Sequence, residues 1–87
     1  MTTLEQTQQQ RLEAILQQLL PSHAIAQWQD DTGLIGDIAE FDSMTLTNLL
    51  TSIEDVFNVE IDESALSLDD FATWGSLKQY TRRLLDA

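Results

Sequence analysis

The sequence predicts a small all-α domain of about four helices. Two segments place apolar residues at the three- and four-residue spacing of one helical face, and a third does so near the C-terminus. No long stretch alternates apolar and polar residues, as a half-buried strand would. The 87 residues are too few for separate domains, so we expect a single domain over residues 1–87.

The first predicted helix ends before Pro21, at a position where proline commonly stops a helix. Thr2 and Glu5 have the spacing of a capping box at its start. Its apolar face is formed by Leu12, Ile15, Leu16, Leu19 and Leu20. The periodicity fades beyond the proline, which predicts a long loop packed down by Trp28 and Leu34.

The second helix is predicted to begin at Ser43, with Asp42 as its N-cap. A carboxylate at this position can accept hydrogen bonds from the free amides of the first turn. Phe41 and Leu46 have the spacing of a hydrophobic staple around this start. The apolar stripe of the helix is Met44, Leu46, Leu49, Leu50, Ile53, Val56 and Phe57.

Two shorter elements and a last helix are predicted beyond it. After a brief extended piece, Ser67 and Asp70 have a capping pattern that opens a short helical turn presenting Leu68 and Phe71. The last helix is expected after Gly75. Its inward residues are predicted to be Leu77, Tyr80, Thr81 and Leu84, and its outward residues Lys78, Arg82 and Arg83.

The chain is strongly acidic, with 15 acidic residues, four basic ones and a net charge of -11. This charge repels nucleic-acid phosphate and anionic lipid and attracts proteins with basic patches. We therefore expect neither nucleic-acid binding nor membrane insertion. The first residues lack the features of a signal peptide, which predicts a cytoplasmic protein, and nothing in the sequence indicates an oligomer rather than a monomer.

Most catalytic and metal-binding patterns are missing from the sequence. There is no cysteine, and the one histidine, His23, lies in the predicted loop. The acids of this loop do not follow the ligand order of an EF-hand. We therefore expect no catalytic residue and no metal site. A pairing of Ser43 with His23 is the enzymatic hypothesis that remains.

Ser43 itself has two interpretations. Serine after aspartate is common at helix starts, because both residues compete for caps and turns. An anion attached there would instead be stabilised by the free amides and the helix dipole. The triplet of Asp42, Ser43 and Met44 does not by itself decide between a structural role and an attachment point.

The stretch GLIGDIAEFDSMTLTNLLTSIEDVFNVEI resembles the family of acyl and peptidyl carrier proteins. In that family a DSL or DSM triplet opens the second helix, and an apolar stripe, an acidic segment and an isoleucine follow. FATWGSLKQY resembles the family's link into its last helix. The resemblance implies a four-helix bundle with a long loop between helices 1 and 2.

The resemblance also implies a chemistry for Ser43. A phosphopantetheinyl transferase would attach a 4'-phosphopantetheine arm to its hydroxyl, and the arm would hold an acyl or aminoacyl group as a thioester. The carrier would catalyse nothing itself. Residues implied to meet basic partner enzymes are Asp42, Met44, Leu46, Glu54, Asp55, Glu60 and Glu63. Residues implied to line an acyl pocket, besides packing in the core, are Leu49, Ile53, Phe57 and Ile61.

Departures from the family pattern favour a dedicated biosynthetic pathway over the housekeeping fatty-acid carrier. Met44 replaces the usual leucine, and Thr45, Thr47 and Asn48 stand where many carriers have acids. The run GLIGDIAEFDSM looks most like stand-alone carriers of exosortase and exopolysaccharide systems. D-alanyl, polyketide and peptide carriers are alternatives. A different class, an acidic helical adaptor that binds a basic protein without a prosthetic group, also stays open.

Overall fold

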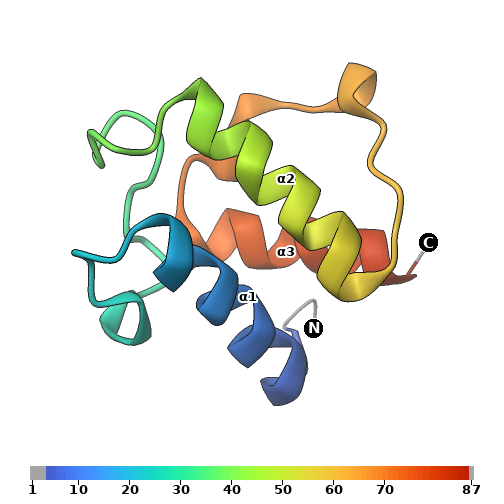
Figure 1. Ribbon diagram of the computed structural model, residues 1–87, viewed down its shortest axis with the longest axis horizontal. Coiled ribbons are helices and arrows are strands. Elements are labelled where there is room, and N and C mark those ends of the chain that lie inside the picture. The colour runs from blue at the N-terminus through green and yellow to red at the C-terminus, as the bar shows by residue number, and fades with distance from the viewer. Residues whose placement is uncertain (1–3, 87) are drawn as a thin grey trace.

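A computed structural model describes residues 4–86 (Figure 1). The α-helices are α1 (Gln6–Leu19), α2 (Ser43–Phe57) and α3 (Trp74–Asp86), and the 3-10 helices are η1 (Ile25–Gln27), η2 (Glu63–Ala65) and η3 (Leu68–Phe71). The described residues contain no strand, so the all-α class is confirmed. The Thr2 half of the predicted capping box lies outside the described residues, and the Glu5 half is wrong, because Glu5 is itself the N-cap of α1 and forms a capping box with Gln8. None of the described helices is both long and apolar enough to cross a membrane.

The predicted count of four helices is not confirmed, because the described residues form three α-helices. The segment expected as a short third helix is η3. Its predicted cap is present, since the Asp69 amide donates to the Ser67 hydroxyl at 3.3 Å. Only Ala72 and Thr73 separate η3 from α3. A run this short favours the tighter 3-10 geometry over an α-helix.

The start of α3 differs from the prediction, because the helix begins at Trp74 rather than after Gly75. The Ser76 amide donates to Thr73 Oγ1 at 3.1 Å, and the Thr73 amide donates to Ser76 Oγ at 3.0 Å. This reciprocal pair is a capping box in which serine replaces the usual glutamate or glutamine. Gly75 therefore belongs to the first turn, and a Cβ there would lie 2.9 Å from the Asp30 carbonyl oxygen.

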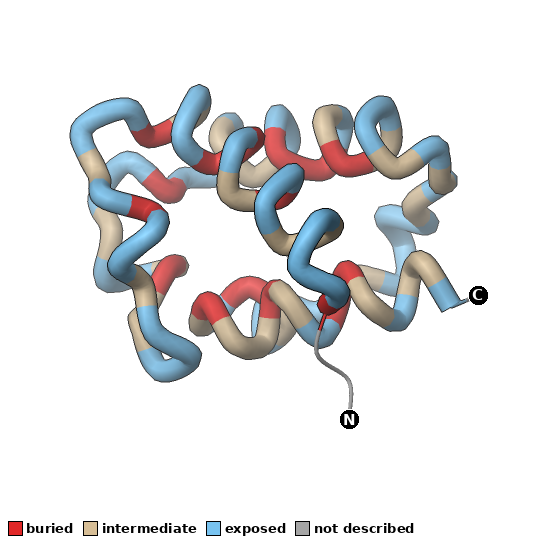
Figure 2. Tube along the Cα trace, turned by 90° about the horizontal axis from the view of Figure 1, so that it is seen from below, coloured by how far each residue is buried: buried red, intermediate tan, exposed pale blue. Residues whose placement is uncertain are grey.

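The three α-helices surround one hydrophobic core. α1 packs against α2, and η3 packs against α3. Figure 2 shows the buried positions of the helices turned toward the interior. Thr81 is buried as predicted, and its hydroxyl donates to the Leu77 carbonyl oxygen at 2.9 Å. The fully buried side chains are Leu12, Leu16, Leu20, Ile25, Leu34, Leu49, Ile53, Phe71, Trp74, Leu77 and Thr81.

The long loop between α1 and α2 is bonded to the start of α3 through its backbone. We call these bonds the loop seam. The amides of Trp74 and Gly75, which have no partner within α3, are satisfied there by loop carbonyls. The seam consists of Leu34 N–H to Ala72 O (2.8 Å), Ile35 N–H to Phe71 O (3.4 Å), Trp74 N–H to Thr32 O (2.9 Å) and Gly75 N–H to Asp30 O (2.9 Å).

The two predicted loop anchors, Trp28 and Leu34, are confirmed. Leu34 is fully buried, and Trp28 packs edge-on against Trp74 with ring centroids 5.6 Å apart. On the other side of the seam, Lys78 Nζ lies 2.6 Å from Asp30 Oδ1 and 5.3 Å from the centroid of Trp74. The loop is therefore held by side chains as well as by its backbone.

Candidate functional site: the start of helix α2

Helix α2 begins at Ser43 with Asp42 as N-cap, as predicted. Asp42 Oδ1 accepts a hydrogen bond from the Thr45 amide at 2.9 Å. This bond is the main reason that the pKa of Asp42 lies below its ordinary value. The Thr45 hydroxyl donates to the Glu40 carbonyl oxygen at 2.8 Å, and Phe41 is buried. The helix start is thus held by its own capping contacts and by the chain before it.

The Ser43 hydroxyl is exposed and forms no hydrogen bond with any described residue. Other serines at helix starts are engaged, because Ser67 caps η3 and Ser76 takes part in the capping box of α3. Ser43 is spared this role because Asp42 does the capping. The arrangement leaves a free nucleophilic hydroxyl at the positive end of a helix.

A cavity of about 240 Å³ opens beside Ser43. Its lining comes from the loop, from the first turns of α2 and from η3, which the chain brings back past α2 (Figure 1). Met44 is 72% exposed at the helix end, and Leu68 is 67% exposed on η3. The lining residues are Ile35, Phe41, Asp42, Ser43, Leu46 and Leu68.

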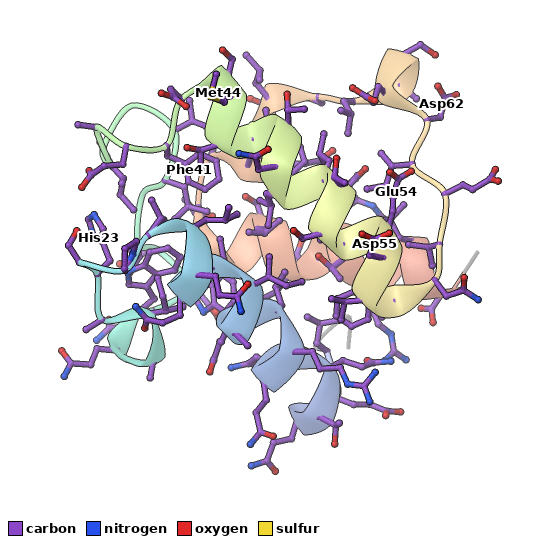
Figure 3. The ribbon with its side chains drawn as sticks, in the orientation of Figure 1. His23, Phe41, Met44, Glu54, Asp55 and Asp62 are labelled. Atoms are coloured by element: carbon purple, nitrogen blue, oxygen red, sulfur yellow. The ribbon has the colours of Figure 1, made fainter. Side chains whose placement is uncertain are left out.

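The acids predicted to meet partner enzymes lie mainly at the other end of α2. Figure 3 shows Glu54 and Asp55 far along the helix from Met44. Asp55, Glu60 and Glu63 are exposed. Glu54 is half-buried, and its Oε2 accepts a hydrogen bond from the Ile61 amide at 2.9 Å. Glu54 therefore also holds the chain that leaves α2.

The residues predicted to line an acyl pocket belong to the core and its edge. Leu49 and Ile53 are fully buried, while Phe57 and Ile61 are partly buried against the core. The cavity beside Ser43 is lined by other residues, and Ile35 and Leu68 were not expected there. The acyl-pocket assignment stays a prediction. The sequence did contain one signal for Leu68, because the predicted short helical turn presents this leucine on its surface.

His23 offers Ser43 no base. Its Nε2 atom lies 3.3 Å from Glu40 Oε2, and Figure 3 shows it on the loop, on the far side of Phe41 from Met44. The pKa of Glu40 is lowered first by a hydrogen bond from its own backbone amide and then by this contact with His23. The structure therefore does not support a catalytic pair of Ser43 and His23.

Comparison with known proteins identifies the family. A family model for the phosphopantetheine attachment site matches residues 10–81. The solution NMR structure of a holo acyl carrier protein from Nitrosomonas europaea is 32% identical, with a TM-score of 0.75 over 90% of this chain and 99% of that chain. Comparison with curated proteins gave no match. The chain belongs to the family of phosphopantetheine-binding acyl carrier proteins.

Membership of this family fixes the general chemistry. The protein carries a covalently attached 4'-phosphopantetheine group, and it is a non-catalytic carrier on which other enzymes act. Carriers of this type are loaded by a phosphopantetheinyl transferase and interact with acyl-handling enzymes. The alternative of an adaptor without a prosthetic group is set aside.

Asp42→Ala is expected to lower the thermal unfolding midpoint by about 4–8 °C, because the Thr45 amide loses its cap. Asp42→Asn should retain most of this stability, since asparagine is a comparable N-cap. Ser43→Ala should change the midpoint little, because the Ser43 hydroxyl bonds to nothing described. A larger loss from Ser43→Ala than from Asp42→Ala would contradict the capping assignment.

The same variants give a pH test. A carboxyl group whose pKa is lower in the folded state stabilises the fold above its unfolded pKa, near 4, and loses that contribution as pH falls through the folded value. The wild type is therefore expected to lose stability relative to Asp42→Asn as the pH falls below about 4. Thermal unfolding between pH 7 and pH 2.5 measures it, and a pH-independent difference would contradict the lowered pKa.

Proposed function

We propose that Ser43 carries the 4'-phosphopantetheine arm. The observation that carries this proposal is the free, exposed hydroxyl at the start of α2, beside an apolar cavity. The amides of the first helical turn and the helix dipole stabilise a phosphodiester at this place. Asp42 repels the phosphate, but its carboxylate is bonded to the Thr45 amide.

Attachment needs coenzyme A, a phosphopantetheinyl transferase and magnesium at the site of the transferase. Ser43 Oγ attacks the phosphorus atom that bears pantetheine, and a new Oγ–P bond forms while the P–O bond of the pyrophosphate breaks. Adenosine 3',5'-bisphosphate leaves, and the hydroxyl proton passes to a base of the transferase. When bound, the arm supplies a thiol that holds the cargo as a thioester.

Intact-mass measurement after incubation with coenzyme A and a broad-specificity phosphopantetheinyl transferase tests this assignment. The expected result is a gain of one phosphopantetheine per chain, and peptide mapping is expected to place it on Ser43. A modification mapped to another serine would overturn the choice of residue. Failure to modify the folded protein with several competent transferases would contradict the proposed function.

We also propose that the cargo belongs to a dedicated biosynthetic pathway. The exposed side of the first turns of α2 carries Thr47, Asn48 and Thr51 in place of acids, with Met44 after the serine. A stand-alone carrier of the exosortase and exopolysaccharide type fits these departures best, with D-alanyl, polyketide and peptide carriers as alternatives. We expect the protein to act as a cytoplasmic monomer, which leaves α2 free for partners.

Basic patches of partner enzymes are proposed to meet the acidic end of α2 and the segment after it. Asp55 and Glu60 are exposed there, whereas the basic residues of α3 are already paired with acids. Met44 and Leu46 would supply apolar contact at the serine end. Long-range attraction of this kind acts mostly on encounter and on partner choice.

Charge removal at this face is expected to weaken transferase recognition. Asp55→Asn should raise the KM for the carrier by about two- to fivefold at low salt, with a smaller effect at high salt. Initial-rate kinetics measure this change. A salt-independent KM for Asp55→Asn would contradict the electrostatic role.

The neighbouring acid Glu54 is expected to matter for stability. Glu54→Gln should lower the free energy of unfolding by about 1 kcal/mol, because the Ile61 amide loses a charged acceptor. Urea unfolding measures this loss.

A further inference from the structure

We propose that the cavity beside Ser43 seats the pantoyl part of the arm, so that the arm folds against the protein while its cargo stays outside the cavity. The pantoyl part is the unit nearest to the phosphate, and it has two methyl groups on one carbon and a hydroxyl on the next. The inference rests on the proposed attachment at Ser43. It assigns the cavity to the arm rather than to the acyl group.

The position of the cavity favours the near end of the arm. Ser43 and Asp42 line the cavity themselves, so a group that fills it lies only a few atoms from Ser43 Oγ. Beyond the phosphate, the arm continues with a methylene and then a carbon that bears two methyl groups. The thiol lies at the opposite end, after two amide bonds. The most apolar unit of the arm is thus the one that can reach the cavity without folding back.

The size and lining of the cavity agree with this occupant. An apolar cavity of about 150 Å³ binds benzene, so about 240 Å³ accommodates a branched unit of roughly that size with some room to spare. The walls formed by Ile35, Leu46 and Leu68 are hydrocarbon, which matches the two methyl groups. Asp42 contributes a polar edge, where the hydroxyl and first amide of the arm can remain solvated.

The surroundings limit what else could enter. One turn beyond Leu46 along α2, Leu49 is fully buried, and Phe71 at the end of η3 is fully buried as well. Neither residue lines the cavity, and a chain that passed from the cavity into the core would have to displace packed side chains of this kind. At the rim, Leu68 is 67% exposed, and an arm lying across it would cover apolar surface that otherwise faces water.

Methyl NMR spectra of the apo, holo and acylated protein test the proposal. Acetyl, hexanoyl and decanoyl forms can be made by transferring the acylated arm from the corresponding coenzyme A thioesters. The methyl signals of Ile35, Leu46 and Leu68 are expected to move between apo and holo protein and then to stay constant with acyl length. The methyl signals of Val56, which lies outside this cavity, are the control and should not move.

Two spectral results would overturn the proposal. Methyl signals at the cavity that change progressively with acyl length would assign it to the cargo. Signals that stay unchanged in protein whose mass shows attachment would mean that the arm points into solvent. Absence of the mass gain would instead contradict attachment itself, so the two failures are distinguishable.

A pair of variants gives a thermodynamic test. Leu68→Gln removes hydrocarbon from the cavity rim, and Val56→Gln makes the same kind of change at another exposed apolar residue, which is 40% exposed. The difference in unfolding midpoint between holo and apo protein is compared within each variant, so any folding cost cancels. Wild type and Val56→Gln are expected to gain a few degrees on attachment, and Leu68→Gln to lose most of that gain. Equal gains in all three proteins would overturn the proposal.

Discussion

Ser43→Ala is expected to abolish phosphopantetheine attachment completely, leaving the mass of the protein unchanged after incubation with coenzyme A and transferase. Alanine has no oxygen to form the phosphodiester, and the Ser43 hydroxyl makes no hydrogen bond that the fold needs. The variant should therefore keep the helical circular dichroism signal of the wild type. Its failure to react can then be ascribed to chemistry rather than to unfolding.

Ser67→Ala is the matched control for this experiment. Ser67 also stands at the start of a helical segment, but its hydroxyl oxygen already accepts a hydrogen bond from the Asp69 amide. It is expected to be modified like the wild type. Attachment that persists in Ser43→Ala, or that is lost equally in both variants, would contradict the proposed role of Ser43.

Trp74→Ala is expected to cost about 3–5 kcal/mol of unfolding free energy, the largest loss that we predict for a single substitution. Trp74 is 1% exposed and contacts Trp28 on the loop and Lys78 on the next turn. Small domains have only about 5–15 kcal/mol to lose, so the variant should be close to unfolding at 37 °C.

Urea unfolding followed by circular dichroism measures this loss without depending on tryptophan fluorescence. Trp28→Ala should cost less than Trp74→Ala, because Trp28 is only half-buried. Val56→Ala, on an exposed side chain, should stay within about 0.5 kcal/mol of the wild type. A cost below 1 kcal/mol for Trp74→Ala would contradict the close packing of Trp74 between the loop and α3.

The start of α2 could be predicted to the residue because its determinants are local. Asp42 caps the amide of Thr45, three positions along, and no distant residue is needed to place that bond. The free hydroxyl of Ser43 follows directly, since the cap is already supplied. The position of the candidate site was therefore accessible from a few consecutive residues.

The start of α3 was predicted wrongly because its local cap has an unusual sequence and because its first amides are bonded by residues far away in the sequence. Gly75 suggested a boundary, but in the structure it allows the Asp30 carbonyl to approach the first turn of the helix. The capping pair of Thr73 and Ser76 lacks the glutamate or glutamine by which such boxes are usually found. Periodicity alone could not show which loop carbonyls would meet these amides.

The candidate site was only partly predictable for the same reason. The exposure of Asp55 follows from its polar place on the helix, whereas Met44, which was counted in the apolar stripe, is exposed. The closeness of Leu68 to Ser43 depends on how the chain after α2 returns along that helix. Glu54 was predicted as a surface acid, but its hydrogen bond to the Ile61 amide depends on this return as well.

The loop seam also holds one wall of the cavity beside Ser43 in place. Ile35 belongs both to the seam and to the cavity lining, so local opening of the seam would take away one side of the cavity. The amides of Leu34, Trp74 and Gly75 are expected to exchange with deuterium together, as one cooperative unit. Such an opening would remove the Ile35 side of the seat that we propose for the pantoyl part of the arm.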